Sequence, residues 1–350
     1  MKFNPYLSAK IVKSFNNASN FKQHRQVADV TYRKNTQIIQ QYKQMEFGKL
    51  PNIENLDFSL PPDPLETAIL LRGLPKSENL AHAYIGCTGW SMKEWVGQVY
   101  PKGTKPPEYL YHYSRQFNTI EMNTTHYRIP TLSDVEKWYK QTPDDFRFAP
   151  KMLQTVSHAK NLGYGTGLTL QFCEAIQGLD EKLGICFMQL PPHFKYDDLA
   201  VLEMYLKKFL PHIPLAIELR HETWFSNPHY FKTVFDLFET YNVSSVITDV
   251  AGRRDVLHQR LTTDTAVIRF VGNNLHETDY TRIEAWVSRL KTWFDMGLKN
   301  VYFFTHEPDN LHAPDLALFL HNKISSNFKA ILRGPVFYDS IKPLQGSFDF

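Results

Sequence analysis

The stretch "PLAIELRHETWF", residues 214–225, has the pattern of a buried β-strand that ends in charged side chains. Leu215, Ile217 and Leu219 form one apolar face of the predicted strand, whereas Glu218 and Arg220 lie on the opposite face. A buried charge is unfavourable unless it is paired. We therefore expect Glu218 and Arg220 to face a cavity, or a partner of opposite charge, at the point where the strand ends.

Similar apolar, β-rich runs recur along the chain. They are found at residues 84–90, 119–123, 146–152, 184–190, 215–220, 244–250, 266–272 and 300–306. Most of the gaps between these runs hold a segment with helical periodicity, and such alternation predicts parallel βαβ units. Eight units over about 245 residues are typical of a (β/α)8 barrel. The predicted fold class is therefore α/β, a TIM-like barrel with an N-terminal extension.

Helical segments are expected at residues 106–117, 133–141, 197–210, 228–241 and 282–297, where apolar residues recur every three or four positions. Pro106 suits a first helical turn. Ser133 and Glu136 have the spacing of a capping box. The gap at 251–265 is too short and polar for a helix, and this makes the sixth unit the weakest one.

The chain is divided by its composition into a basic, Pro-rich N-terminal extension (residues 1–80), the barrel (81–325) and a tail (326–350). Residues 1–50 contain nine Lys or Arg against two acidic residues, a balance of +7, whereas the whole chain is only +3. Clustered cations can bind phosphates without reading a base sequence. A solvated extension is the first interpretation of residues 1–50, and a weak nucleic-acid contact is the second.

The bulk composition is that of a globular protein, with 43% hydrophobic and 21% charged residues. Cys87, Cys173 and Cys186 lack metal-ligand spacing and are expected to be buried thiols. The first 30 residues contain no apolar signal-peptide core, and no apolar run reaches the 18 residues needed to span a membrane. We therefore expect a cytoplasmic protein that does not contact a membrane.

Polar side chains gather where the predicted strands end. In TIM barrels the active site lies at the C-terminal ends of the strands, here called the mouth. The candidate catalytic residues are Glu121, Lys151, Glu218 and Asp249. The candidate substrate-binding residues are Arg220, Arg269, Asn123, Gln189, His221, Trp90 and His306. Three acids and three bases at one end predict a site, although an ion-pair network with a purely structural role is the alternative.

Several of these residues have a second interpretation. His221 and His306 could titrate near neutral pH or serve as hydrogen-bonded wall residues. Trp90 could stack on a substrate or pack in the core. The glycines of "NLGYGTGLTL", residues 161–170, precede a helix but do not follow a strand directly, so a phosphate-binding loop is only weakly indicated.

Five blocks resemble, in order, the domain of unknown function 72 family, the YecE-like proteins. They begin with "YIGCTGWSMKEWVGQVYPKGTKPPEYLYHYSRQFNTIEMNTTHYRIP" and continue with "WYKQTPDDFRFAPKM", "LGICFMQLPPHFKYD", "AIELRHETWF" and "VYFFTHEPDNLHAPDLA". The resemblance covers about residues 82–320 and implies a TIM-like barrel, but no established activity. The matching blocks carry Glu121, Asn123, Lys151, Gln189, Glu218, Arg220 and His221. His126, Val271, Thr305 and His306 depart from the family pattern, so the resemblance implies no shared role there.

Four functions are compatible with these residues. The first is an enzyme that binds an anionic small molecule through Arg220, Arg269 and Lys151 and transfers protons through acidic side chains. The second is a phosphodiesterase or isomerase that uses Mg²⁺ or Mn²⁺ held by carboxylates. The third gives Lys151 a Schiff-base role. The last is a nucleic-acid-associated adaptor, for which "QGSFDF", residues 345–350, could be a docking peptide.

Overall fold

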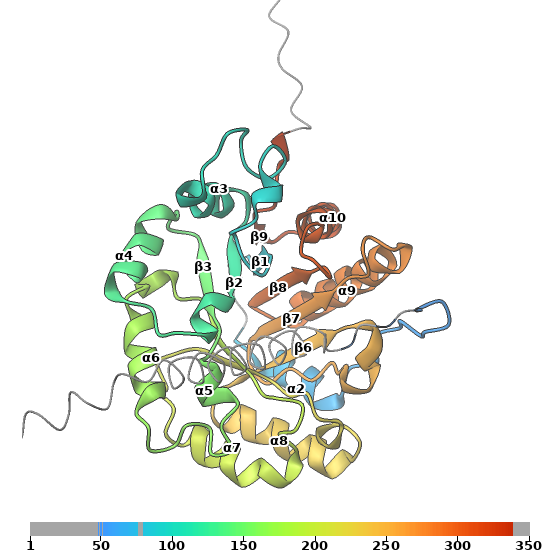
Figure 1. Cartoon of the computed structure of the whole chain (residues 1–350). Helices are drawn as coiled ribbons and strands as arrows, with labels where there is room; N and C mark the ends of the chain where they lie inside the picture. The colour runs from blue at the N-terminus through green and yellow to red at the C-terminus, as the bar shows by residue number, and fades with distance from the viewer. Residues whose placement is uncertain (1–47, 49, 51, 76–79, 339–350) are drawn as a thin grey trace, which may run out of the picture. The chain divides into compact units, whose positions relative to one another are not determined.

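Eight parallel strands follow one another around the molecule, with helices outside them (Figure 1). The computed structural model describes residues 48, 50, 52–75 and 80–338. The strands are β1 (His82–Gly86), β2 (Thr119–Met122), β3 (Arg147–Pro150), β4 (Cys186–Gln189), β5 (Leu215–Glu218), β6 (Ser244–Asp249), β7 (Thr265–Val271) and β8 (Asn300–His306). The predicted α/β fold, a TIM-like barrel, is therefore confirmed.

Hydrogen bonding divides the barrel wall into two parts. One sheet has the order β4-β5-β6-β7-β8-β1-β9, in which β9 (Ile331–Leu332) pairs with β1, and β2 pairs with β3 separately. Backbone bonds connect the two parts on both sides. Glu121 N donates to Cys87 O beside β1 (3.0 Å), and Met152 N donates to Phe187 O beside β4 (2.8 Å). The β2–β3 pair thus occupies the place between β1 and β4.

Side chains replace strand-to-strand hydrogen bonds between β1 and β2. The Asn118 amide accepts from Ile85 N (2.8 Å) and donates to Ala83 O (2.9 Å). The Tyr113 hydroxyl accepts from Cys87 N (2.7 Å) and donates to Thr119 O (3.1 Å). Both side chains are buried, and the backbone groups that a regular ladder would pair are satisfied through them instead.

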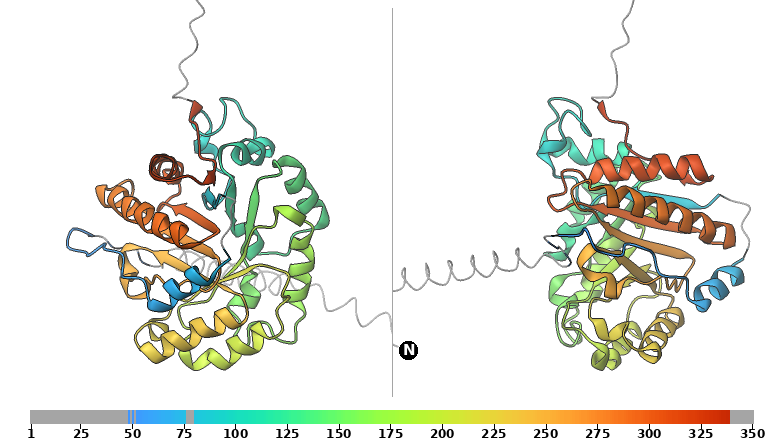
Figure 2. Two further views of the ribbon diagram at one scale, coloured as in Figure 1. Left: turned by 180° about the vertical axis from the view of Figure 1, so that it is seen from behind. Right: turned by 90° about the vertical axis from the view of Figure 1, so that its right-hand side faces the viewer.

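The outer layer consists of helices (Figures 1 and 2). The α-helices are α2 (Leu65–Gly73), α3 (Tyr109–Gln116), α4 (Leu132–Gln141), α5 (Gln154–Ser157), α6 (Leu168–Gln177), α7 (Leu199–Leu206), α8 (Pro228–Thr240), α9 (Glu277–Met296) and α10 (Ala313–Asn327). The 3-10 turns are η2 (Lys93–Trp95), η3 (Pro106–Glu108), η4 (Asn123–His126), η5 (Asp180–Lys182), η6 (Tyr196–Asp198), η7 (Glu222–Trp224) and η8 (Ala251–Val256). Figure 2 shows α9 and α10 side by side outside β7 and β8.

Three details of the helices differ from the sequence prediction or refine it. The capping box of α4 is formed by Thr131 and Asp134, because the helix begins two residues earlier than Ser133 requires. Helix α9 begins at Glu277, since His276 caps its N-terminus by accepting from Thr278 N. Only the short turn η8 lies between β6 and β7, as the weak sixth unit predicted.

The described part of the N-terminal extension packs on the barrel. Asp63 forms an ion pair with Arg289 and accepts from Trp293 Nε1 (3.0 Å), and both partners belong to α9. Thr67 of α2 is buried and its hydroxyl donates to Gln259 O (2.9 Å). Residues 1–47 and the peptide 345–350 lie outside the described residues, so the predicted nucleic-acid contact and docking peptide stay predictions.

The interior of the barrel has an apolar floor below the mouth. It is formed by the inward-facing side chains of Tyr84, Ala149, Ile185, Phe187, Ala216, Val246, Val267, Tyr302 and Phe304. The three cysteines are free and buried, as predicted. None of the helices in the described part of the chain is long and apolar enough to cross a membrane.

Candidate functional site

A group of polar side chains lies above the apolar floor, at the C-terminal ends of the strands. Because side chains alternate between the two faces of a strand, a side chain that comes two residues after a floor residue also points inward. The group, called here the mouth cluster, consists of Glu121, Asn123, Lys151, Gln189, Glu218, Arg220, Arg269 and His306. The structure thus brings eight of the eleven predicted site residues together.

Arg269 of β7 is the central cation of the mouth cluster. Its Nε and Nη2 donate to the two carboxylate oxygens of Glu121 at 2.8 and 3.0 Å, and its Nη1 donates to Glu218 Oε2 at 2.8 Å. Both carboxylates are fully buried. Burial alone would raise their pKa values, but the Arg269 charge holds the pKa of Glu121 well below, and that of Glu218 below, the ordinary value. Both carboxylates are therefore ionised.

Gln189 connects this ion-pair group to Lys151. Its amide nitrogen donates to Glu218 Oε2 (2.8 Å), and its amide oxygen accepts from Lys151 Nζ (3.0 Å). The Lys151 side chain is buried, and its Nζ lies 5.6 Å from the centre of the Phe187 ring in the floor. Burial lowers the pKa of Lys151 to about 8, and the Arg269 charge acts in the same direction. The lysine therefore titrates just above neutral pH.

His306 and Asn123 complete the surroundings of Glu121. His306 Nε2 lies 3.0 Å from Glu121 Oε2, and Asn123 Nδ2 donates to Glu121 Oε1 at 3.1 Å. Burial lowers the pKa of His306, although Glu121 opposes this effect. Each oxygen of Glu121 thus has two partners, so this carboxylate is held in one orientation.

Arg220 is the third cation of the mouth cluster and lies near Glu218. Its Nε is 3.8 Å from Glu218 Oε1, and its backbone oxygen accepts from Arg253 Nη2 at 2.9 Å. Burial lowers the pKa of Arg220 to about 10. The guanidinium therefore remains charged at neutral pH and adds a third positive charge to the mouth.

Two histidines near Lys151 are kept neutral. His126 and His158 pack edge to face, with ring centres 5.6 Å apart. Burial lowers the pKa of each to about 4, and the Lys151 charge acts in the same direction on both. His126 Nδ1 also lies 2.7 Å from Met152 O. These contacts make both histidines wall residues of the barrel, and no sequence pattern singled out His158.

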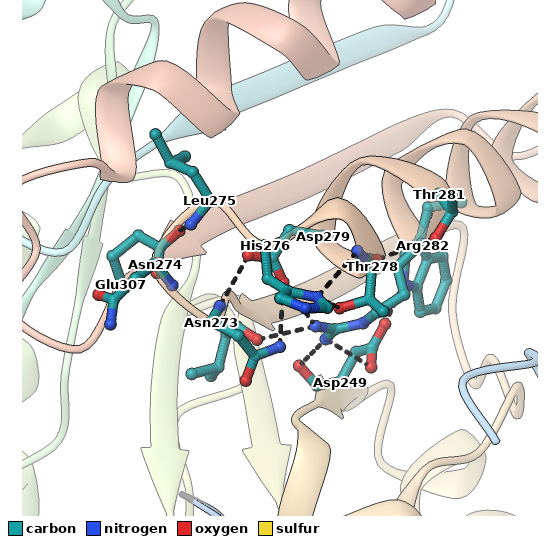
Figure 3. Close-up of polar contacts among 12 residues, drawn as sticks. Asp249, Asn273, Asn274, Leu275, His276, Thr278, Asp279, Thr281, Arg282 and Glu307 are labelled. Carbon is teal, nitrogen blue, oxygen red and sulfur yellow. Dashed lines mark hydrogen bonds and ion pairs between the residues drawn. The ribbon is translucent and has the colours of Figure 1, made fainter. Parts of the chain in front are cut away.

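Asp249 does not join the mouth cluster, which corrects the expected convergence. Thr248 is the residue of β6 that follows Val246 on the inward face, so Asp249 points outward to the helices. There its carboxylate accepts from Arg282 Nη2 of α9 at 2.8 Å (Figure 3). It also accepts from Trp286 Nε1 of α9 (2.7 Å) and pairs with Arg254. Because successive side chains of a strand point to opposite faces, Asp249 belongs to a structural ion-pair group with Arg282 and Arg254 outside the barrel interior.

A second carboxylate lies in the same outer region, beside the β7–α9 loop. Glu307 accepts from the backbone N–H groups of Asn274 (2.8 Å) and Leu275 (3.2 Å), both of which have left-handed φ values near 58° (Figure 3). Burial raises the pKa of Glu307 to about 7, and Asp279 adds to this rise. Glu307 was not among the predicted residues, since it follows β8 on the outward face.

Trp90 and His221 lie outside the hydrogen-bonded group. The Trp90 ring packs edge to face on Trp138 of α4, with centres 6.3 Å apart. His221 Nδ1 accepts from Thr223 N (3.1 Å) and so caps η7. These contacts favour core packing for Trp90 and the wall interpretation for His221.

The mouth has an excess of positive charge among the described residues. In the mouth cluster, Lys151, Arg220 and Arg269 lie beside two carboxylates, Glu121 and Glu218, because the third predicted acid, Asp249, points outward. Thr248 Oγ1 and Glu218 Oε1 are buried without a hydrogen-bond partner in the described part of the chain. The mouth therefore combines net positive charge with polar atoms that a bound molecule can satisfy.

The donor set does not resemble a metal centre. Within residues 52–75 and 80–338 no group of three or more His, Cys, Asp or Glu side chains is arranged to hold a metal ion. Two cavities, of about 480 and 410 Å³, lie away from the mouth cluster. The first is lined by residues such as Gly184, Pro214 and Asn300 at the N-terminal ends of strands, and the second by Tyr164 and Lys208 between α6 and α7.

Comparison with known proteins agrees with this architecture. Residues 84–337 match the family model described as protein of unknown function DUF72. The chain belongs to the DUF72 family. It is 30% identical over 251 residues to the UPF0759 protein YecE of Escherichia coli (strain K12), covering 67% of this chain and 89% of that protein. It is 31% identical over 165 residues to the UPF0759 protein YunF of Bacillus subtilis (strain 168), covering 43% of this chain and 55% of that protein.

Solved structures share the fold. The crystal structure of a DUF72 family protein from Enterococcus faecalis V583 at 3.10 Å covers 73% of this chain and 98% of its own, with a TM-score of 0.59 and 21% identity. A 2.52 Å structure of the same protein gives a TM-score of 0.57 at 22% identity, covering 71% of this chain and 99% of its own. The mouth cluster of this chain therefore lies in a fold that the chain shares with solved structures of the DUF72 family.

Proposed function

We propose that this DUF72 protein is an enzyme that binds a small anionic substrate in the barrel mouth and acts on it by proton transfer. The observation that supports the proposal is the charge balance of the mouth. Three cationic side chains surround two carboxylates, and both carboxylates are engaged by Arg269. Lys151 forms no ion pair with a carboxylate of the described residues, so an anion beside it would compensate its charge in a buried setting, where such compensation is worth most.

The same residues supply the proton chemistry. A general acid or base is most effective when its pKa lies near the working pH. Lys151, with a pKa of about 8, lies near that condition. Glu121 and Glu218 stay ionised and stabilise positive charge rather than carry protons. We therefore assign the proton transfer to Lys151, and substrate binding to Arg220 with Lys151.

Anion binding can be measured directly by isothermal titration calorimetry with inorganic phosphate, sulfate and acetate at low ionic strength. We expect phosphate or sulfate to bind with a 1:1 stoichiometry. Arg220→Met and Lys151→Met should each weaken binding at least tenfold. Lys207→Met is the matched control, because Lys207 is an exposed cation of α7 paired with Glu203 (2.6 Å) and lies outside the mouth. Equal affinity in all four proteins, or no anion binding at all, would contradict the proposal.

A further inference from the structure

The backbone around Lys151 fixes the start of its side chain between two strands. Lys151 N donates to Met122 O beside β2 (3.2 Å), and Lys151 O accepts from the Thr125 hydroxyl (2.8 Å). On the other side, Lys151 forms a bridge with Phe187 of β4. The amine is therefore carried by a rigid part of the barrel wall, as a positioned reactive group requires.

The contacts of the amine are unusual for a buried lysine. Arg269 engages both carboxylates of the mouth cluster, and no carboxylate of the described residues forms an ion pair with Lys151. Its Nζ donates instead to the neutral amide of Gln189 at 3.0 Å. An amide oxygen stabilises an ammonium less than a carboxylate does, so the neutral amine is the more accessible form.

A second buried lysine shows what a structural lysine looks like in this fold. Lys182, which is 2% exposed, donates to Tyr139 O (2.9 Å) and Thr142 O (2.7 Å) and lies 3.7 Å from Asp144. Two carbonyls and a carboxylate hold its ammonium in place. Lys151 has one such contact, and it faces the barrel interior rather than the helix layer.

We propose that Lys151 is a nucleophile that forms a Schiff base with the carbonyl carbon of an anionic aldehyde or ketone bound in the mouth. This inference rests on the proposed function, because the anionic group of the substrate is what places its carbonyl near Lys151. The substrate class is a small oxo-acid or a phosphorylated carbonyl compound, which share a carbonyl carbon a few bonds from an anion. Arg220 would hold that anion.

The chemistry balances without a further reactant. The lone pair of the neutral Nζ forms a bond to the carbonyl carbon, and the carbonyl π electrons move to oxygen, which takes a proton to give a carbinolamine. Nitrogen loses a proton, and the hydroxyl then leaves as water after a second protonation, which gives the protonated imine. In total, the neutral amine and the carbonyl take up one proton from solvent and release one water, so atoms and charge balance.

The environment of the mouth supports the same step. Burial and the Arg269 charge lower the pKa of Lys151 to about 8, so a substantial fraction of the amine is unprotonated at mildly alkaline pH. The buried Thr248 Oγ1, which has no hydrogen-bond partner in the described residues, and Glu218 Oε1 provide acceptors inside the mouth. A carbinolamine hydroxyl is a donor of the kind that these atoms lack.

The experiment is reductive trapping with borohydride on the full chain. The protein is incubated with glyoxylate, pyruvate or dihydroxyacetone phosphate, reduced, digested and mapped by mass spectrometry. We expect an adduct on Lys151 at least tenfold above that on Lys182, which serves as a buried control within the same sample. The neutral carbonyls acetone and dihydroxyacetone should label Lys151 at least tenfold more slowly than their anionic counterparts. The carboxylate and phosphate probes distinguish the two substrate types.

The outcomes separate this inference from the proposed function. An adduct on Lys151 that inorganic phosphate suppresses supports both. Phosphate binding with no preferential adduct on Lys151 from any of the three probes overturns the Schiff base and leaves the anion site intact. Absence of both phosphate binding and the adduct overturns both.

A nearly isosteric variant adds a test that does not remove the lysine. Gln189→Met removes the acceptor of Lys151 Nζ and should lower its pKa further, so the trapping rate should reach its half-maximum at a lower pH than in the wild type. A pH profile that is unchanged in Gln189→Met would count against Lys151 as the reacting amine. Circular dichroism of the variant checks that it is folded.

Discussion

Arg269 and Glu121 form a side-on bidentate pair across the barrel interior, with N–O distances of 2.8 and 3.0 Å, although they are 148 residues apart in the chain. Glu121 is fully buried, and Arg269 is only 9% exposed. The pair connects β2 with β7, and the additional bond from Arg269 to Glu218 includes β5. One guanidinium therefore holds three strands at the mouth.

Removal of this guanidinium should destabilise the protein strongly. Arg269→Met leaves two buried carboxylates without their cation, and we expect a loss of about 3–5 kcal/mol in the free energy of unfolding. The measurement is urea unfolding followed by circular dichroism. The triple variant Glu121→Gln, Glu218→Gln, Arg269→Met should recover part of this loss, since the two buried carboxylate charges are removed together with their cation. A triple variant less stable than the single one would contradict this account.

The stability of the wild type relative to Lys151→Met should depend on pH. The folded pKa of Lys151, about 8, lies below its ordinary value of 10.5, so between these values the unfolded chain binds more protons. The wild type should therefore gain stability relative to the variant as pH rises from 8 to 10.5, by up to about 3 kcal/mol. Below pH 8 the cost of the buried charge is fully present. A difference that is constant from pH 7 to 10.5 would show that Lys151 has an ordinary pKa.

Glu307 should give a pH dependence at lower pH. Its folded pKa, about 7, lies above the ordinary 4.5, so between these values the folded protein binds more protons. The free energy of unfolding should therefore fall as pH rises from 4.5 to 7. Asp279, which raises this pKa, and His312, which lowers it, are the charged neighbours.

Glu307→Gln tests the assignment. The variant keeps an acceptor for Asn274 N and Leu275 N but cannot ionise, so its stability relative to the wild type should increase across this pH range. The measurement is urea unfolding at pH 5, 6, 7 and 8. Asp134→Asn is a suitable control, because Arg128 holds the pKa of Asp134 below its ordinary value and therefore outside this pH range. A relative stability independent of pH would exclude Glu307 as the titrating group.

Asp249 should be important for stability and unimportant for anion binding. Asp249→Ala leaves the buried Arg282 without the carboxylate that it contacts at 2.8 Å and removes the acceptor of Trp286 Nε1. We expect a loss of about 3–5 kcal/mol in the free energy of unfolding. Phosphate affinity, measured by calorimetry at a temperature where the variant is folded, should stay within twofold of the wild type. A tenfold change in phosphate affinity would show that Asp249 takes part in anion binding.

Much of the barrel could be predicted from the sequence. Each of the eight predicted strands exists, and their inner faces follow from alternation, as Glu218 on β5 illustrates. The β2–β3 pairing and the bonds from Asn118 and Tyr113 to β1 could not be predicted, because they depend on contacts that no local pattern encodes. The start of α9 was missed since His276 is an infrequent capping residue.

The site was predictable to the extent that strand register is predictable. Glu121, Lys151, Gln189 and Arg269 lie on inward positions as expected. Asp249 was misplaced because a period of two makes any one-residue error a change of face. The ion-pair partner of each charge was not predictable either, because only the folded barrel brings Arg269 next to Glu121 and Glu218.

The connection between β1 and β2 has a consequence for how occupancy of the mouth can be observed. The β2–β3 pair is joined to β1 largely through the Asn118 side-chain amide and the Tyr113 hydroxyl. It therefore has fewer backbone hydrogen bonds to break than the seven-stranded sheet, and its amide protons should exchange with deuterium sooner. Glu121 belongs to β2, and Lys151 directly follows β3. Deuterium uptake by the peptides around residues 119–122 and 147–150 should therefore report whether the mouth is filled, even for a molecule whose identity is not yet known.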